Sequence, residues 1–138
     1  MRIESFCLCR SVAVKGNNSI DLIGIFDHMA ALGEPILSQP FVVAAIIRFF
    51  SSESGSHRFQ IVTKNGAGTT LASSTEIVSI SNLPTESLVQ LISCRMGPTG
   101  LKFGRYDFSI EQNGKSLAKT VLYVSLGSEG GQRRFPVS

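Results

Sequence analysis

Apolar and polar residues alternate with a period of two along much of the chain, and turn-forming residues stand at each break in the pattern. The clearest case is residues 104–124, which predict a β-hairpin around Asn113-Gly114. This pair supplies the positive φ angles that a tight primed turn requires. Because side chains alternate along a strand, one face of the first strand of this hairpin combines Tyr106, Phe108 and Ile110.

Further strands follow from the same pattern before this hairpin. Residues 5–14 and 19–29 predict an opening hairpin, in which Gly24 indicates a bulge or a close backbone approach. Residues 41–47 contain no polar side chain, which is typical of a central strand covered on both faces. Residues 30–40 predict a long connection. The remaining strands are predicted at 57–63, 69–80 and 87–96.

About eight to ten short strands, with turns at intervals of roughly 8 to 15 residues, predict an all-β fold, and we favour an antiparallel sandwich. Tyr106 stands in a Gly-x-Tyr-x-Phe context, where immunoglobulin-like domains place a tyrosine whose hydroxyl bonds to the backbone upstream. The chain lacks the tryptophan and the paired cysteines of an antibody-type domain. We expect one domain over residues 1–126 and a flexible tail over residues 127–138.

Four segments carry recurring strand and turn residues. They read Ile-Gly-Ile-Phe-Asp at 23–27, Phe-Val-Val-Ala-Ala at 41–45, Gly-Ser-His-Arg-Phe-Gln-Ile at 55–61 with Asn65-Gly66, and Gly-Arg-Tyr-Asp-Phe at 104–108 with Asn113-Gly114. Together they resemble the successive motifs of a family of small uncharacterised bacterial proteins. The resemblance covers residue 3 to about residue 124. It implies an immunoglobulin-like β-sandwich and brings no established activity, cofactor or catalytic residue.

Length, composition and charge narrow the classes of function. A chain of 138 residues with 43% apolar and 17% charged residues can close one core without disulfides. Its net charge of +3 is mild and its basic residues are scattered, so nucleic-acid binding is not favoured. The longest apolar run, 41–47, is far shorter than the roughly 20 residues of a membrane-spanning helix. The N-terminal residues do not match a signal peptide, so we expect a cytoplasmic protein.

Three cysteines, Cys7, Cys9 and Cys94, are too few and of odd number for a closed disulfide framework. Cys7 and Cys9 share a face of the predicted strand, which is compatible with two soft metal ligands. Free cysteine is among the most buried residue types, so we interpret all three as small core residues. We therefore predict neither a metal nor a cofactor.

No catalytic motif stands out in the sequence. A nucleophile elbow, a phosphate-binding loop and a zinc-binding histidine pair on a helix are all absent. The remaining candidates for acid-base chemistry or metal binding are Asp27, His28, Glu34 and His57, which fall near strand ends where loops could gather them. We predict no enzyme activity, and we keep as an alternative a small-molecule, metal or hydrolase-like site around Asp27, His28 and His57.

Carbohydrate recognition is weakly indicated, because the chain has no tryptophan and we expect both tyrosines, Tyr106 and Tyr123, to face the core. What remains is protein-protein interaction. Unsatisfied backbone groups on the edge strands of a sandwich can pair with a partner's strand or with a second copy. The leading hypothesis is therefore a non-catalytic interaction or assembly module, with a protein partner or a homo-oligomer.

Overall fold

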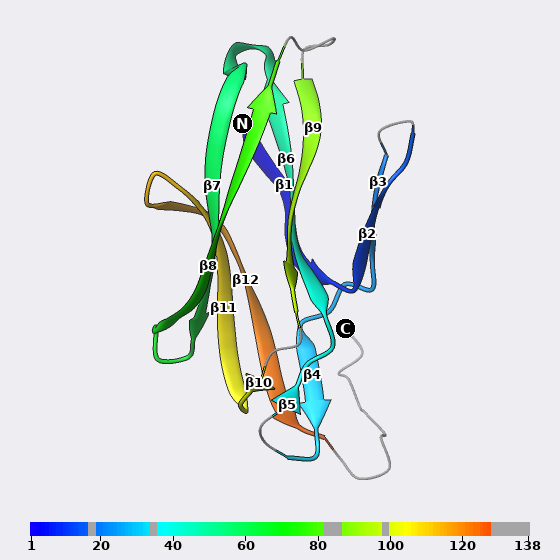
Figure 1. Ribbon diagram of the computed structural model, residues 1–138, viewed down its shortest axis with the longest axis vertical. Coiled ribbons are helices and arrows are strands. Elements are labelled where there is room, and N and C mark those ends of the chain that lie inside the picture. The colour runs from blue at the N-terminus through cyan, green and yellow to red at the C-terminus, as the bar shows by residue number, and fades with distance from the viewer. Residues whose placement is uncertain (17–18, 34–35, 82–86, 98–99, 128–138) are drawn as a thin grey trace.

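The computed structural model describes residues 1–16, 19–33, 36–81, 87–97 and 100–127. The tail predicted to be flexible lies outside these residues from position 128 onward. A short 3-10 helix, η1 (Ser51–Glu53), separates β6 from β7. The strands, shown in Figure 1, are β1 (Arg2–Cys9), β2 (Ser11–Val14), β3 (Ile20–Ile23), β4 (His28–Ala31), β5 (Ile36–Leu37), β6 (Phe41–Phe50), β7 (Gly55–Asn65), β8 (Thr70–Ile80), β9 (Ser87–Met96), β10 (Gly100–Leu101), β11 (Gly104–Gln112) and β12 (Lys115–Leu126).

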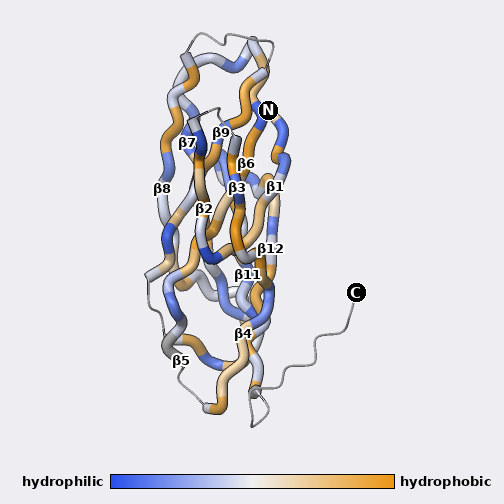
Figure 2. The backbone as a smooth tube through the Cα atoms, turned by 90° about the vertical axis from the view of Figure 1, so that its right-hand side faces the viewer, coloured by the Kyte–Doolittle hydropathy of each residue, from blue (hydrophilic) through white to orange (hydrophobic). Residues whose placement is uncertain are grey.

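Two sheets face each other and form the predicted sandwich (Figure 1). One sheet has three antiparallel strands in the order β1-β6-β9, and the other has five strands in the order β4-β12-β11-β7-β8. The pair β4-β12 is parallel, so the larger sheet is mixed. A two-stranded arm, β2-β3, lies on the side of the three-stranded sheet that faces away from the larger sheet (Figures 1 and 2). It adds a small third layer.

The hydrophobic core lies between the two sheets. Phe49, Phe59 and Phe108 are its largest fully buried side chains, and the Phe41 and Phe108 rings meet edge to face with centroids 6.2 Å apart. Strand β6 is central, as predicted, because it pairs with β1 on one side and with β9 on the other. The predicted turn residues of the β11-β12 hairpin adopt positive φ angles of 53° and 77°. Its expected inward face is confirmed for Tyr106, Phe108 and Ile110.

The first two predicted strands are each divided, and this corrects the simple opening hairpin. Residues 5–14 separate at Arg10 into β1 and β2, and residues 19–29 separate at Gly24 into β3 and β4. Gly24 has a φ of 70°, and a Cβ atom there would lie 2.8 Å from Cγ of Arg10. The predicted close approach at Gly24 is thus real, although the neighbour is a side chain. The predicted connection over 30–40 contains the end of β4 and the short strand β5.

Two tyrosines have opposite environments. The buried hydroxyl of Tyr106 accepts a hydrogen bond from the Lys102 N–H (2.8 Å) and donates one to the Lys102 carbonyl (3.1 Å), which fixes the chain before β11. Tyr123 was expected in the core, but its side chain is 42% exposed. It lies between two inward residues, Leu122 and Val124, so alternation places it outside. Its ring stacks on His28, with centroids 5.2 Å apart.

Phe108→Ala should lower the free energy of unfolding by about 3 to 5 kcal/mol, because it removes a buried ring and leaves a cavity. Asp107→Ala is the matched control, since Asp107 points outward and pairs with Arg105 at 2.9 Å. Its loss should cost less than about 1 kcal/mol. Denaturant unfolding of both variants measures the difference, and equal shifts would contradict the alternation of β11.

Tyr106→Phe should lower the free energy of unfolding by about 1 to 3 kcal/mol, because both backbone groups of Lys102 lose a hydrogen-bond partner. Tyr123→Phe removes a hydroxyl from an exposed ring and should leave the free energy of unfolding nearly unchanged. Denaturant midpoints for the two variants provide the measurement. If both variants lost the same free energy of unfolding, the hydrogen bonds between Tyr106 and Lys102 would contribute no more than the hydroxyl of an exposed tyrosine.

Candidate functional site

The acid-base candidates do not converge. His28 and Asp27 form an exposed pair, with 2.7 Å between Nδ1 and Oδ1. His57 lies near the beginning of β7, where its Nε2 is 2.6 Å from the Glu53 carbonyl and its ring lies against Phe49. Asn65, at the far end of β7, is eight residues away from His57. It pairs with Tyr106 on β11, which pairs with Leu122 on β12, and the next residue of β12, Tyr123, pairs with His28. At about 3.3 Å per residue, this offset separates the two histidines by about 26 Å along the strand direction alone, so they cannot share an ion or a small substrate. Glu34 lies outside the described residues.

The cysteines divide between the two faces of the three-stranded sheet. Cys7 and Cys9 share the outer face, as predicted from their spacing, whereas Cys94 packs against the core. Burial raises the pKa of both the Cys7 and the Cys9 thiols, which favours the protonated form at neutral pH. Within the described residues, no group of three or more His, Cys, Asp or Glu side chains is placed to hold a metal ion.

The outer faces of the two sheets differ in chemistry. On the five-stranded sheet, charged and polar side chains oppose one another across neighbouring strands, as in the pairs Gln60 with Glu111 and Lys64 with Asp107. This is the pattern of a face in contact with water. On the three-stranded sheet, the centre of the outer face is apolar. Its residues are Val42, Ala44 and Ile46 on β6, Val89 and Leu91 on β9, and Cys7 and Cys9 on β1.

The arm presents a second apolar surface beside this outer face. Its register places Val12 and Leu22 on one face together with Val14 and Ile20. At the base of the arm, Val12 and Val42 line a cleft of about 450 Å³. Val14, farther along the same face, is 60% exposed, so the far part of the arm is not covered by the sheet. The arm and the sheet therefore leave apolar side chains open toward each other.

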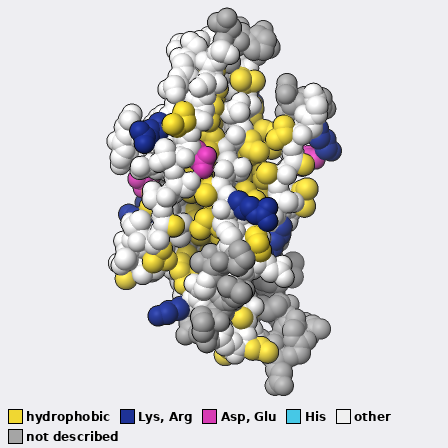
Figure 3. All heavy atoms as spheres, viewed as in Figure 1, with side chains coloured by type: hydrophobic (Ala, Val, Ile, Leu, Met, Phe, Trp, Pro, Cys, Tyr) yellow, Lys and Arg dark blue, Asp and Glu magenta, His cyan; other side chains and the backbone are white. Residues whose placement is uncertain are grey.

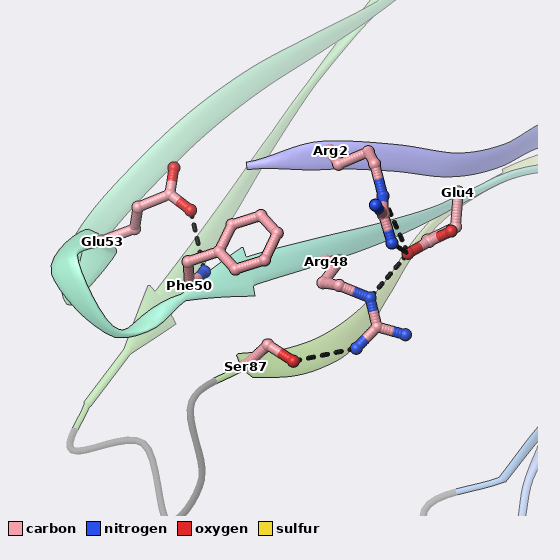
Figure 4. Close-up of polar contacts among 6 residues, drawn as sticks. All are labelled: Arg2, Glu4, Arg48, Phe50, Glu53 and Ser87. Atoms are coloured by element: carbon pink, nitrogen blue, oxygen red, sulfur yellow. Dashed lines mark hydrogen bonds and ion pairs between the residues drawn. The ribbon is translucent and has the colours of Figure 1, made fainter.

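Polar contacts connect the three strands at the opposite end of this face (Figure 4). The Glu4 carboxylate accepts hydrogen bonds from Arg2 (2.8 Å) and Arg48 (2.6 Å), and Arg48 also donates to the Ser87 hydroxyl at 2.9 Å. Nearby, Glu53 accepts a hydrogen bond of 2.8 Å from the backbone N–H of Phe50. The guanidinium groups of Arg2 and Arg48, in that order, hold the pKa of Glu4 below its ordinary value of 4.5.

The surface formed by the arm and the outer face was missed in the sequence, although its signals are present. Alternation in 11–14 and 20–23 marks a two-stranded element with one apolar face. The missing information was that both strands leave the sheet at Arg10 and Gly24. The apolar run in β6 was interpreted as a strand covered on both faces, whereas its outer face is only partly covered.

Glu4→Gln should make the unfolding temperature less dependent on pH in the acid range. Because the folded-state pKa of Glu4 is lowered, its carboxylate stabilises the fold above pH 4.5 and loses this effect as the pH falls through the lowered pKa. The variant should unfold below the native chain at pH 7, and the gap should close as the pH falls. Glu111→Gln, which removes a carboxylate without an ion pair to a described residue, is the control. A gap that stays constant with pH would contradict the assignment.

In the described part of the chain, no helix has the length and apolar character needed to cross a membrane. The search among curated proteins found no match. One family model matches residues 4–125, which extend from β1 into β12 and include the arm, both sheets and the Glu4 network. The predicted resemblance to an uncharacterised family is thereby confirmed. The chain belongs to the family of unknown function DUF6941.

Proposed function

We propose that this chain is a non-catalytic assembly module that pairs with a second copy of itself through the arm and the outer face of the three-stranded sheet. The observation that carries the proposal is the exposure of Val14 on an arm face that otherwise turns toward an apolar sheet. On the outer face of the sheet, Ala44 and Cys9 are fully buried, whereas Val42, Ile46, Val89 and Leu91 are half-buried and leave part of their surface to a partner.

The arm supplies the first argument. An isolated two-stranded hairpin is marginally stable in water and needs a third strand or a packed layer for support. Here the support is at the base, where the Arg10 guanidinium lies 4.2 Å from the centre of the Phe26 ring. Farther out, next to the turn, Val14 is 60% exposed. At the base, on the opposite face of the arm, Ile23 is 51% exposed. A second layer over the far part of the arm would cover Val14.

The contrast between the two sheets supplies the second argument. Scattered apolar residues on a surface need no explanation, but a contiguous apolar face marks an interaction site. On the outer face of the three-stranded sheet, Ile46 pairs with Leu91 on β9, and Ala44 and Val42 pair with Cys7 and Cys9 on β1, so apolar side chains adjoin one another across the three strands. On the five-stranded sheet, exposed apolar side chains such as Ile77 and Tyr123 stand opposite arginines, Arg58 and Arg105, in the ladders of neighbouring strands.

A second copy satisfies both needs in one contact. In a two-fold dimer each patch is used twice, so the arm of one chain can lie on the outer face of the other while the reverse contact forms simultaneously. Arg2 and Arg48 share Glu4, and Lys15 on the arm pairs with Asp21, so most charges on these surfaces are already compensated. The residual charge is positive, and Arg95 adds to it. Salt should therefore strengthen self-association by screening this repulsion.

The proposal also includes an immunoglobulin-like arrangement of the sandwich. The hydroxyl of Tyr106 bonded to the Lys102 backbone supports an immunoglobulin-like arrangement, since such domains use a tyrosine in this way. Bacterial origin and a cytoplasmic location stay predictions from the sequence.

Val14→Lys should weaken self-association and raise the dimer dissociation constant by about tenfold or more, because it places a charge in an apolar contact on a basic surface. Ile77→Lys is the matched control, since Ile77 is 63% exposed on the edge strand β8. Sedimentation equilibrium from micromolar to near-millimolar concentration, at low and high salt, measures the constants. We expect a dimer for the native chain and for Ile77→Lys.

Two results would overturn the proposal. The first is a native chain that stays monomeric over the whole range of concentration and salt. The second is a dimer that is unaffected by Val14→Lys, which would place the interface elsewhere.

A further inference from the structure

A cavity of about 640 Å³ lies between the two sheets. Strands from both layers contribute to its wall, including Phe41 on β6, Leu122 on β12, and Tyr106 and Phe108 on β11. It reaches the edge strands through Leu71 on β8 and Met96 on β9. In the same view as Figure 1, hydrophobic side chains reach the surface along the line between the layers (Figure 3). Ligand pockets commonly have volumes of about 300 to 1,000 Å³.

A buried hydroxyl lies in the wall of this cavity. Thr63 is 6% exposed and is paired with Phe108 across the β7-β11 ladder, so it occupies the core face of β7. Its side chain has no hydrogen-bond partner among the residues that the structure describes. Burying a hydroxyl without a partner is costly, and such groups usually bond to protein, water or ligand. Thr63 therefore provides a polar point of recognition in a largely apolar cavity.

The mouth of the cavity is apolar and cationic. Leu71 and Phe103 line it and are 51% and 38% exposed. Lys102 lies beside them and forms no ion pair with any described residue, whereas Arg105 is engaged by Asp107 at 2.9 Å. No Asp or Glu belongs to the described lining. An anionic group on a ligand would meet one uncompensated ammonium group there.

We propose that this cavity binds a small amphipathic carboxylate that carries a second polar group, such as a medium-chain hydroxy acid. Its apolar body fills the space between the sheets, its hydroxyl pairs with Thr63, and its carboxylate lies near Lys102. The cavity and the cleft at the base of the arm share Phe41, but Thr63 and Lys102 line only the cavity, so failure of this proposal and failure of the dimer proposal can be told apart.

Isothermal titration of the full chain with three probes tests the proposal. The probes are 10-hydroxydecanoate, decanoate and 1,10-decanediol, which share a ten-carbon body and differ in their polar ends. We expect the hydroxy acid to bind best. Loss of its hydroxyl should weaken binding by about tenfold, as expected for one buried hydrogen bond. Loss of its carboxylate should weaken binding by about threefold, because the ion pair is exposed.

Variants of the chain test which residues cause these differences in probe affinity. Thr63→Val should bind decanoate and 10-hydroxydecanoate equally, and Lys102→Gln should bind the hydroxy acid and the diol equally. Lys119→Gln, on the outer face of β12, should behave like the native chain. Thr63→Val should also raise the unfolding temperature of the ligand-free chain, because it removes a buried hydroxyl that lacks a partner.

Three outcomes would overturn the inference. One is the absence of saturable binding for all three probes up to millimolar concentration. Another is unchanged probe selectivity in Thr63→Val and Lys102→Gln. The third is a lower unfolding temperature for ligand-free Thr63→Val, which would show that the hydroxyl already has a partner.

Discussion

The close approach of the Arg10 side chain to Gly24 is the constraint on which the outer layer depends. The Arg10 N–H donates to the carbonyls of Ile23 (2.9 Å) and Gly24 (3.2 Å), while the Phe26 N–H donates to the Leu8 carbonyl at 3.0 Å. These contacts join the two chain segments where both bend. Any other residue at position 24 would place its Cβ atom against the Arg10 side chain and would also have to adopt a positive φ. As a result, β2 and β3 leave the sandwich together, and they leave the outer face of β6 only partly covered.

Local sequence signals predicted the strands and turns better than they predicted which strands pair with each other. Asn113-Gly114 and the long apolar strand β6 were recognised because turn chemistry and hydrophobic runs are properties of a few neighbouring residues. The division at Arg10 was not recognised, because apolar residues resume in the same register after it: Val12 and Val14 continue the spacing of Phe6 and Leu8. The parallel pair β4-β12 joins residues almost a hundred positions apart. No local pattern encodes such a pairing, since it depends on the packing of the whole sheet.

The same distinction applies to the sites. Asp27, His28 and His57 have suitable chemistry, but the separation of the two histidines follows from the length of β7 and the order of the strands. Thr63 could have been found, because it continues the buried face that begins with Phe59 and Ile61. A threonine in that position looks like an ordinary β-strand residue. Its meaning comes from the cavity and from the lack of a partner in the described residues, which are properties of the folded chain.

The two proposed sites meet at the beginning of β6. Successive side chains of a strand point to opposite faces, so Phe41 reaches the cavity between the sheets while Val42 faces the cleft under the arm. Phe41 also borders that cleft, and its ring contacts the ring of Phe26 with centroids 5.6 Å apart. The Arg10 guanidinium packs on the same Phe26 ring. Because packed interiors transmit small displacements, a ligand that moves Phe41 acts on the support of the arm. If ligand binding changes the stability of the dimer in this way, dimerisation must change ligand affinity by the same factor.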